Sequence, residues 1–249
     1  MKIMAIGSGS SGNCTYLEIN GKRLLVDLGL NTKAISCALS KIDVSLSDID
    51  AVIITHTHSD HVSALPVCKK KLCCSFFMST LSDSKLCVEN TVVIPCDRAV
   101  AVTEGIQITA FETSHDCPGS LGFRLDYNGG SFGYATDLGF VPDKIRNVLK
   151  GCDAVVLECN HDEQMLRDGP YPFLLKRRIL SNEGHLSNDA CAKTARFLAE
   201  NGTKSIFLAH LSKENNTPGK AFRTVSSVLD GMDVHLGVLS PTCGELMEL

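Results

Sequence analysis

The stretch His56-Thr57-His58-Ser59-Asp60-His61 decides the interpretation of this chain. It follows directly on the apolar run 51–54, whose β-branched residues predict a strand. Imidazole and carboxylate groups are common ligands of zinc and similar divalent ions. Because residues two apart face the same way in an extended segment, the first two histidines are expected to bind one ion. The aspartate and the last histidine are expected to bind a neighbouring ion, so the sequence predicts a metal centre at a strand end.

Three further candidate ligands come after predicted strands: His115 after 106–111, Asp137 after 131–135 and His210 after 205–208. Repeated placement at strand ends suggests one shared edge, where these side chains would meet the first cluster. His115 would complete the set of His56 and His58 around one ion. His210 would join Asp60 and His61 around the other. Asp137 offers two oxygens that can bridge both ions, with room for a bridging water.

The rest of the chain predicts two series of strands with helices beside them. Strands are expected at 3–6, 15–19, 23–26, 51–54 and 75–78, with Asn20-Gly21 as a hairpin turn and helices at about 32–40 and 63–71. A second, antiparallel sheet is expected from 92–94, 100–103, 106–111, 122–127 and 131–135. Helices at about 142–149, 188–200 and 219–229 alternate with strands at 154–157, 205–208 and 235–238. This pattern predicts an α/β (α+β) four-layer αβ/βα sandwich that forms one domain over 1–249.

Composition limits the classes of function. The chain has 249 residues, 44% hydrophobic content and a formal net charge of −4, so a nucleic-acid ligand would need a local basic patch or bound cations. No apolar run approaches the roughly 20 residues of a membrane span, and Gly7-Ser8-Gly9 interrupts any signal-peptide core. The sequence therefore predicts a soluble, cytoplasmic protein without a membrane partner, and it indicates no obligate protein partner.

The twelve cysteines form no C-x-x-C pair, which argues against a disulfide framework. Cys14, Cys37, Cys87, Cys152 and Cys191 lie among apolar residues, so we expect them in the core.

The candidate ligands, in this order, resemble the motifs of the metallo-β-lactamase superfamily over nearly the whole chain. Asp137 stands where the main zinc β-lactamases have cysteine, which implies a phosphodiesterase or glyoxalase-type branch instead of antibiotic hydrolysis. Glu158 at a strand end and His185 before a helix resemble tRNase Z-type phosphodiesterases. The resemblance implies that His185 lies beside the scissile phosphate as a non-ligand, while Glu158 orients it and favours its charged form.

A narrower resemblance is to the YycJ/WalJ group, which is described as double-stranded DNA 5′-to-3′ exonucleases. It rests on the segment 7–14 (GSGSSGNC), on 169–172 (GPYP) followed by 184–188 (GHLSN), and on 210–218 (HLSKENNTP). The resemblance implies a nuclease whose partner is nucleic acid, and DNA is the expected substrate.

Two segments are candidates for substrate binding. The loop with Ser8, Ser10, Ser11 and Asn13 can turn backbone N–H groups toward a phosphate, although it is equally typical of a tight connection. The basic run of Lys176, Arg177 and Arg178 precedes His185 and could bind the nucleic-acid backbone, although such runs are also common on solvated faces.

These features predict a dinuclear metal-dependent phosphodiesterase, with a metal-bridging hydroxide as nucleophile, Asp60 as ligand and base, and protonated His185 at the leaving oxygen. Nitrogen and oxygen ligands suit Zn²⁺ and Mn²⁺ alike. A glyoxalase-type thioester hydrolase and an RNA-processing nuclease of tRNase Z-like type are the enzymatic alternatives. A flavodiiron-type module is a further alternative, but such modules usually carry a flavin domain and replace some of these histidines with carboxylates.

Overall fold

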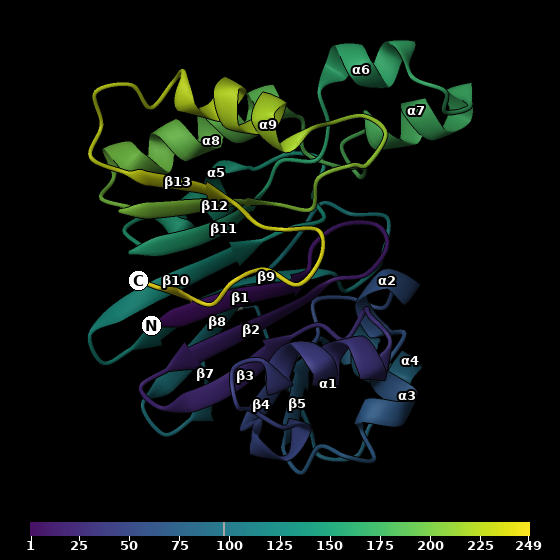
Figure 1. Cartoon of the computed structure of the whole chain (residues 1–249), viewed down its shortest axis with the longest axis vertical. Helices are drawn as coiled ribbons and strands as arrows, with labels where there is room; N and C mark the ends of the chain where they lie inside the picture. Colours follow the sequence, from purple (N-terminus) through teal and green to yellow (C-terminus); the bar gives the residue numbers. More distant parts are fainter. Residues whose placement is uncertain (97) are drawn as a thin grey trace. The chain divides into compact units, whose positions relative to one another are not determined.

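Two compact units make up the chain in the computed structural model, which describes residues 1–96 and 98–249 (Figure 1). Unit 1 comprises Met1–Ala110, Cys117–Leu121 and Ser240–Leu249, and unit 2 comprises Phe111–Asp116 and Gly122–Leu239. The single domain over 1–249 stays a prediction.

A seven-stranded sheet in the order β14-β1-β2-β3-β4-β5-β6 is the framework of unit 1. Its strands are β1 (Lys2–Gly7), β2 (Cys14–Ile19), β3 (Lys22–Val26), β4 (Ala51–Ile53), β5 (Ser75–Met78), β6 (Thr91–Val93) and β14 (Met247–Glu248). Strands β1 to β3 form an antiparallel meander, and β3 to β6 run parallel. Asn20 (φ 50°) and Gly21 (φ 76°) form the predicted turn, because both adopt the positive φ that a tight hairpin requires.

The prediction that 92–94 belongs to a second, antiparallel sheet is wrong. Strand β6 pairs parallel with β5 in the first sheet. Helix α4 (Thr80–Leu86), which the sequence did not predict, joins the two strands, and a parallel neighbour requires such a crossover. The antiparallel hairpin of β7 (Val100–Thr103) and β8 (Ile106–Glu112) follows close to its predicted bounds.

The helices of unit 1 begin with α1 (Thr32–Ser40), which matches its predicted range and has Asn31 as N-cap. The 3₁₀ helix η1 covers Leu46–Asp48. The predicted helix 63–71 is wrong in extent: the structure has α2 (Ser59–Val62) and α3 (Leu65–Cys68) instead. Pro66 lies in the first turn of α3, where its missing N–H leaves no helical hydrogen bond unmade.

Strands β9 to β13 form the sheet of unit 2, in the order β13-β12-β11-β10-β9. They are β9 (Leu121–Tyr127), β10 (Gly130–Ala135), β11 (Ala154–Glu158), β12 (Ser205–Ala209) and β13 (His235–Val238). Strands β9 and β10 are antiparallel, and β10 to β13 are parallel. Helices α5 (Asp143–Leu149), α8 (Asn188–Glu200) and α9 (Pro218–Ser226) cover this sheet, with α8 and α9 side by side (Figure 1).

Two short helices of unit 2 were not predicted. Helices α6 (Glu163–Asp168) and α7 (Phe173–Ile179) follow β11 and lie beyond the ends of the strands, away from α8 and α9 (Figure 1). Each has only about two turns, which is too short for a helical period to stand out in the sequence.

Each unit has its own hydrophobic core. In unit 1, Leu39 and Val52 are among the buried residues of the core, and in unit 2, Leu157 and Leu198 are. Cys14, Cys152 and Cys191 are buried as predicted, whereas the prediction for Cys37 and Cys87 is wrong, because both are exposed on or after helices. The described cysteines form no disulfide. No helix within the described ranges is long and apolar enough to cross a membrane.

Parallel strands place the candidate residues of unit 2. The carboxyl ends of β10, β11 and β12 share one edge of the sheet, and Asp137, Glu158 and His210 stand at these ends. Asp137 (φ 58°) and His210 (φ 56°) both adopt the left-handed region, which is strained for residues other than glycine. Such strain often lies at functional sites, and turn residues such as Asn20 and Asp43 share it.

Candidate metal centre and active site

In unit 1, the histidines of the opening stretch lie together after β4. The ring centroids of His56 and His58 are 4.8 Å apart, and those of His56 and His61 are 4.0 Å apart. Helix α2 begins at Ser59, so Asp60 and His61 lie in its first turn, where the sequence predicted no helix. His58 is the N-cap residue, and its extended backbone turns the chain into this helix.

Asp27, which the sequence analysis missed, fixes the orientation of His61. Nδ1 of His61 lies 2.8 Å from Oδ2 of Asp27, a fully buried carboxylate. Because an ionised carboxylate can only accept hydrogen bonds, Nδ1 carries the proton and Nε2 keeps its lone pair. The only signal in the sequence was an aspartate directly after the apolar strand 23–26.

Thr55 extends this arrangement to His56. Its backbone N–H and its hydroxyl both donate to Asp27, each at 2.8 Å. Since the hydroxyl of Thr55 donates its proton to Asp27, its oxygen can accept a hydrogen bond from Nδ1 of His56, which lies 3.1 Å away. Nε2 of His56 is then also the nitrogen with the lone pair. One buried aspartate therefore orients two candidate ligands, directly and through a hydroxyl.

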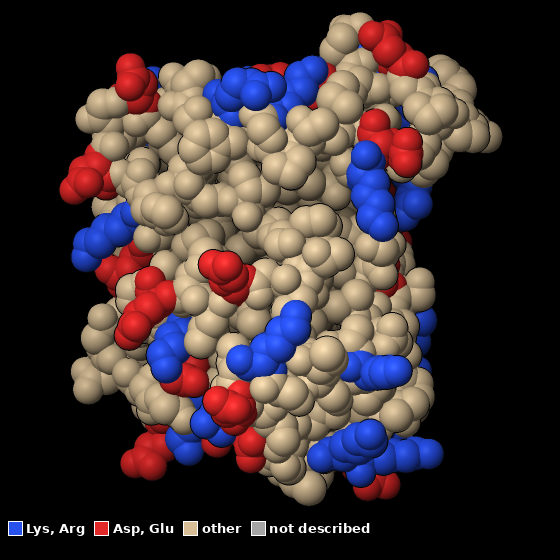
Figure 2. All heavy atoms as spheres, in the orientation of Figure 1, with Lys and Arg blue, Asp and Glu red and all other residues tan. Residues whose placement is uncertain are grey.

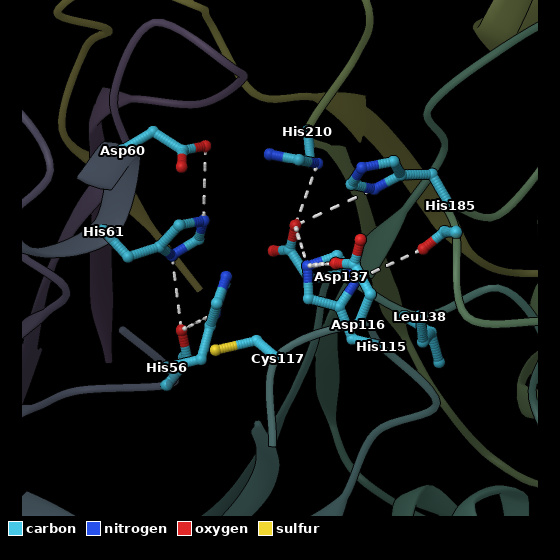
Figure 3. A network of polar contacts seen from close by, with 12 residues as sticks. His56, Asp60, His61, His115, Asp116, Cys117, Asp137, Leu138, His185 and His210 are labelled. Atoms are coloured by element: carbon cyan, nitrogen blue, oxygen red, sulfur yellow. Dashed lines mark hydrogen bonds and ion pairs between the residues drawn. The ribbon is translucent and has the colours of Figure 1, made fainter. Parts of the chain in front are cut away.

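In unit 2, Glu158 is the centre of a polar network that includes His185 and His210, which Figure 3 shows beside Asp137. Its Oε1 accepts from Nδ1 of His185 at 2.8 Å and from Nδ1 of His210 at 2.9 Å. Its Oε2 accepts from the backbone N–H groups of Leu138 at 3.0 Å and Leu186 at 3.2 Å. The structure thus brings Glu158 and His185 together, and it adds a contact to His210 that sequence reasoning missed.

The protonation state of Glu158 follows from this network. Complete burial favours the neutral acid, but the neighbouring charge and hydrogen bond of His185 and the hydrogen bond of His210 more than offset burial and lower the pKa to about 2. Glu158 is therefore a carboxylate at neutral pH.

Asp137 and His115 complete the candidate residues of unit 2. Oδ1 of Asp137 lies 3.5 Å from Nδ1 of His210, 3.7 Å from Nδ1 of His185 and 3.9 Å from Nε2 of His115. Nδ1 of His115 lies 3.3 Å from the carbonyl oxygen of Gly184, an acceptor, so this ring also presents Nε2 as the nitrogen with the lone pair.

These residues fit divalent metal ions. Ligand atoms of Asp137, Glu158, His185 and His210 lie within 4.8 Å of one another. Glu158 already accepts four hydrogen bonds, so Asp137 and His210 are the better ligands of this group. Four of these histidines have an oxygen within hydrogen-bond distance of Nδ1: His56, His61, His115 and His210. This arrangement is typical of histidines that bind a metal ion through Nε2. Histidine and aspartate groups able to hold metal ions are therefore present in the chain.

In the loop predicted to bind phosphate, which contains Ser8, Ser10, Ser11 and Asn13, the side chain of Asn13 contacts candidate metal ligands. Asn13 is buried and its Oδ1 accepts from the backbone N–H of Gly9 at 2.8 Å. Its Nδ2 lies 2.9 Å from Nε2 of His61 and 3.4 Å from Oδ2 of Asp60, so Asn13 contacts candidate ligands. Ser8 is also buried, and Ser10 and Ser11 are exposed. Phosphate binding by this loop stays a prediction.

The basic run lies on α7 but is not a uniform patch. Nζ of Lys176 donates to the carbonyl oxygen of Arg167 at 2.6 Å, and Arg178 forms an ion pair with Asp116. The guanidinium of Arg177 stands 5.8 Å from the ring centroid of Phe173. Backbone binding by these residues stays a prediction.

Comparison with known proteins decides the family. Residues 22–211 match the family model described as beta-lactamase superfamily domain. The chain belongs to this superfamily. This superfamily member is 37% identical over 245 residues to the exodeoxyribonuclease WalJ of Streptococcus pneumoniae, covering 95% of the chain and 91% of the relative. It is 35% identical over 234 residues to the exodeoxyribonuclease YycJ of Bacillus anthracis, covering 90% of the chain and 88% of the relative. The resemblance to the YycJ/WalJ group is confirmed.

Solved structures confirm the fold class. The metallo-β-lactamase fold protein YhfI from Bacillus subtilis superposes with a TM-score of 0.78 over 99% of both chains, at 17% sequence identity. At this identity the likeness establishes the fold alone. The chain has the metallo-β-lactamase fold.

Proposed function

We propose that the chain is a metal-dependent exodeoxyribonuclease that degrades DNA in the 5′-to-3′ direction. Its similarity to two proteins named exodeoxyribonuclease extends over at least 90% of its length. The single observation that carries the proposal is Glu158, which holds His185 in unit 2 next to Asp137 and His210. A metal centre that uses Asp137 and His210 as ligands would leave the ordered His185 without a role.

The proposed cofactors are two divalent ions, Zn²⁺ or Mn²⁺. His56, His58 and His115 would hold one ion, Asp60, His61 and His210 the other, and Asp137 would bridge them. When bound, such ions lower the pKa of a shared water to near neutrality and neutralise charge on the phosphate. The absence of a thiolate from this ligand set leaves both metals chemically suitable.

The protein residues would supply orientation and proton transfer. Because Nδ1 of His185 donates to Glu158, its Nε2 is the atom that can face a scissile phosphate. Protonated at Nε2, His185 would donate to the leaving oxygen, and the carboxylate of Glu158 would stabilise the charged ring. Asp60 would orient the attacking water and can accept its proton.

The glyoxalase-type alternative gives no role to the pair of His185 and Glu158. An RNA substrate would be compatible with the same chemistry, so the substrate must be tested directly. Metal-loaded protein is incubated with end-labelled single-stranded and double-stranded DNA and RNA, and the product ladders are compared. Successive removal from the 5′ end of DNA is expected; cleavage of RNA alone, or of a glutathione thioester alone, contradicts the proposal.

The role of His185 is tested by His185→Ala. Turnover should fall by about 10²-fold or more, the typical contribution of a positioned acid, while metal content stays close to that of the wild type. His235→Ala is the control, because His235 is exposed at the start of β13. If His185→Ala loses metal in proportion to activity, His185 is a ligand or a structural residue and the proposed role is wrong.

A further inference from the structure

Two adjacent apolar side chains stand out on the surface of α7. Phe173 is 71% exposed and Leu174 is 75% exposed, the largest values among the exposed large apolar residues of the described chain. Single exposed apolar side chains are ordinary on protein surfaces, but neighbouring ones of this size indicate an interaction site. The outer end of the α6 and α7 region is mostly uncharged in Figure 2.

The segment that presents these side chains is stiff. Pro172 is the N-cap residue of α7, and Pro170 precedes it by two positions. Proline fixes φ and restricts the residue before it, so little conformational entropy is lost when this segment binds a partner. Phe173 and Leu174 are therefore held in position without being buried.

The positive charge of Arg177 points to an anionic partner. The helix sequence Phe173–Ile179 (FLLKRRI) contains three basic residues and no acidic residue; Arg178 is paired with Asp116 and Lys176 donates to the carbonyl oxygen of Arg167, so Arg177 supplies the charge beside Phe173. The guanidinium of Arg177 lies against the ring of Phe173, so a flat cationic group and an aromatic face form one surface. Aromatic rings beside basic groups are the combination that binds unpaired bases by stacking and their phosphates by charge. A purely apolar protein partner would gain nothing from these charges.

Contacts within unit 2 connect α7 to the candidate ligands. Arg178 on α7 forms an ion pair with Asp116, whose Oδ1 lies 3.5 Å from Nε2 of His115. Gly139, two residues after Asp137, packs so closely on the backbone of Ser181 and Asn182 that no side chain would fit there. A strand of DNA on α7 would therefore adjoin the segments that carry His115 and Asp137.

We propose that Phe173, Leu174 and Arg177 form a stacking platform for unpaired bases at the end of the DNA substrate. This inference rests on the proposed exodeoxyribonuclease function. It adds an end-recognition element that lies outside the metal centre and the catalytic pair. DNA with a single-stranded 5′ end is the preferred ligand of this platform, because its bases expose their faces.

The test measures binding of metal-loaded protein to fluorescein-labelled DNA with phosphorothioate linkages, which resist cleavage. The double variant Phe173→Ser, Leu174→Ser should bind a duplex with a 5′ overhang about tenfold more weakly than the wild type. Binding to a duplex closed by hairpins at both ends should change by less than twofold. The single variant Phe173→Trp should bind this DNA as tightly as the wild type, because an aromatic ring is retained. Phe222→Ser is the control, since Phe222 is an exposed aromatic residue on α9.

Salt dependence separates stacking from charge. Arg177→Gln should reduce the slope of log binding constant against log salt concentration by about 1, whereas the double variant should leave this slope unchanged. The small ester bis-p-nitrophenyl phosphate cannot contact the metal centre and α7 at the same time. The ratio of the rate of DNA cleavage to the rate of hydrolysis of this ester should therefore fall about tenfold in the double variant.

Several outcomes would overturn the inference. Equal binding and cleavage of overhang DNA by the wild type and the double variant would overturn the platform alone. So would loss of self-association in the double variant with unchanged DNA binding, because the surface would then bind a second copy of the chain. A wild-type protein that neither binds nor cleaves any DNA would overturn both the platform and the proposed function.

Discussion

Replacement of Glu158 by glutamine should destabilise the protein although the side chain keeps its size. Glu158 accepts hydrogen bonds from His185, His210 and two backbone N–H groups. An amide has no charge, and its NH₂ group would face donors. Hydrogen bonds to charged groups contribute about 1 kcal/mol more than neutral ones, so the loss over this network is about 3–5 kcal/mol.

The pKa of Glu158 expresses the same interactions as a dependence of stability on pH. Its value in the folded protein is about 2, against an ordinary value of 4.5. A folded-state pKa below the unfolded one stabilises the protein above pH 4.5, and this contribution is lost as the pH falls toward 2. The difference corresponds to about 3 kcal/mol, which is the same order of magnitude as the loss expected from the hydrogen bonds.

The assay is urea unfolding of chelator-treated protein at several pH values, with activity of the metal-loaded protein measured separately. Glu158→Gln should lower the free energy of unfolding by about 3–5 kcal/mol at pH 7, and the gap to the wild type should narrow below pH 4. Glu163→Gln is the control, because Glu163 forms an exposed ion pair with Arg167 on α6. Equal stability of Glu158→Gln and wild type at pH 7 would refute the reasoning.

Three further predictions concern other parts of the molecule. Asp27→Asn should weaken metal binding about 10- to 100-fold, measured by competition with a chromophoric chelator, because His61 loses the carboxylate that orients it; unchanged affinity would contradict this. Burial lowers the pKa of His161 to about 4, so this ring is neutral in the folded protein at pH 7. The free energy of unfolding should therefore fall as the pH is lowered from 6.5 to 4. His161→Gln should make this fall smaller, as measured by urea unfolding, and an unchanged fall would contradict the prediction. Removal of metal by a chelator should lower Tm and abolish nuclease activity, and both should return with Zn²⁺ or Mn²⁺, as measured by thermal unfolding and product ladders.

Regular local patterns explain what could be predicted from the sequence. The hairpin at Asn20 and Gly21, strand β5 and helix α8 depend on turn chemistry, a short apolar run and capping, which are all local. Strand β6 was assigned to the wrong sheet because pairing depends on tertiary neighbours, which a run of three strand residues does not encode. The exposure of Cys37 shows the same limit, since a helical residue among apolar neighbours can still face solvent.

The candidate site was predictable where residue types repeat at strand ends. His56 to His61 form a dense cluster, and Glu158 and His185 were found through motif resemblance. Asp27 was missed because a lone aspartate after a strand has no spacing that distinguishes it from a turn residue. Its contact with His61 joins residues that are 34 positions apart, which only the folded chain brings together.

The sharing of one Glu158 oxygen by His185 and His210 limits how this site can diverge. A single negative charge serves both the proposed proton donor and the proposed metal ligand, so neither ring can be adjusted alone. A variant that strengthens the hydrogen bond from one imidazole to Glu158 weakens the hydrogen bond from the other. A change in the acidity of His185 would therefore also alter the orientation of His210, unless a second acidic side chain took over one of the two rings.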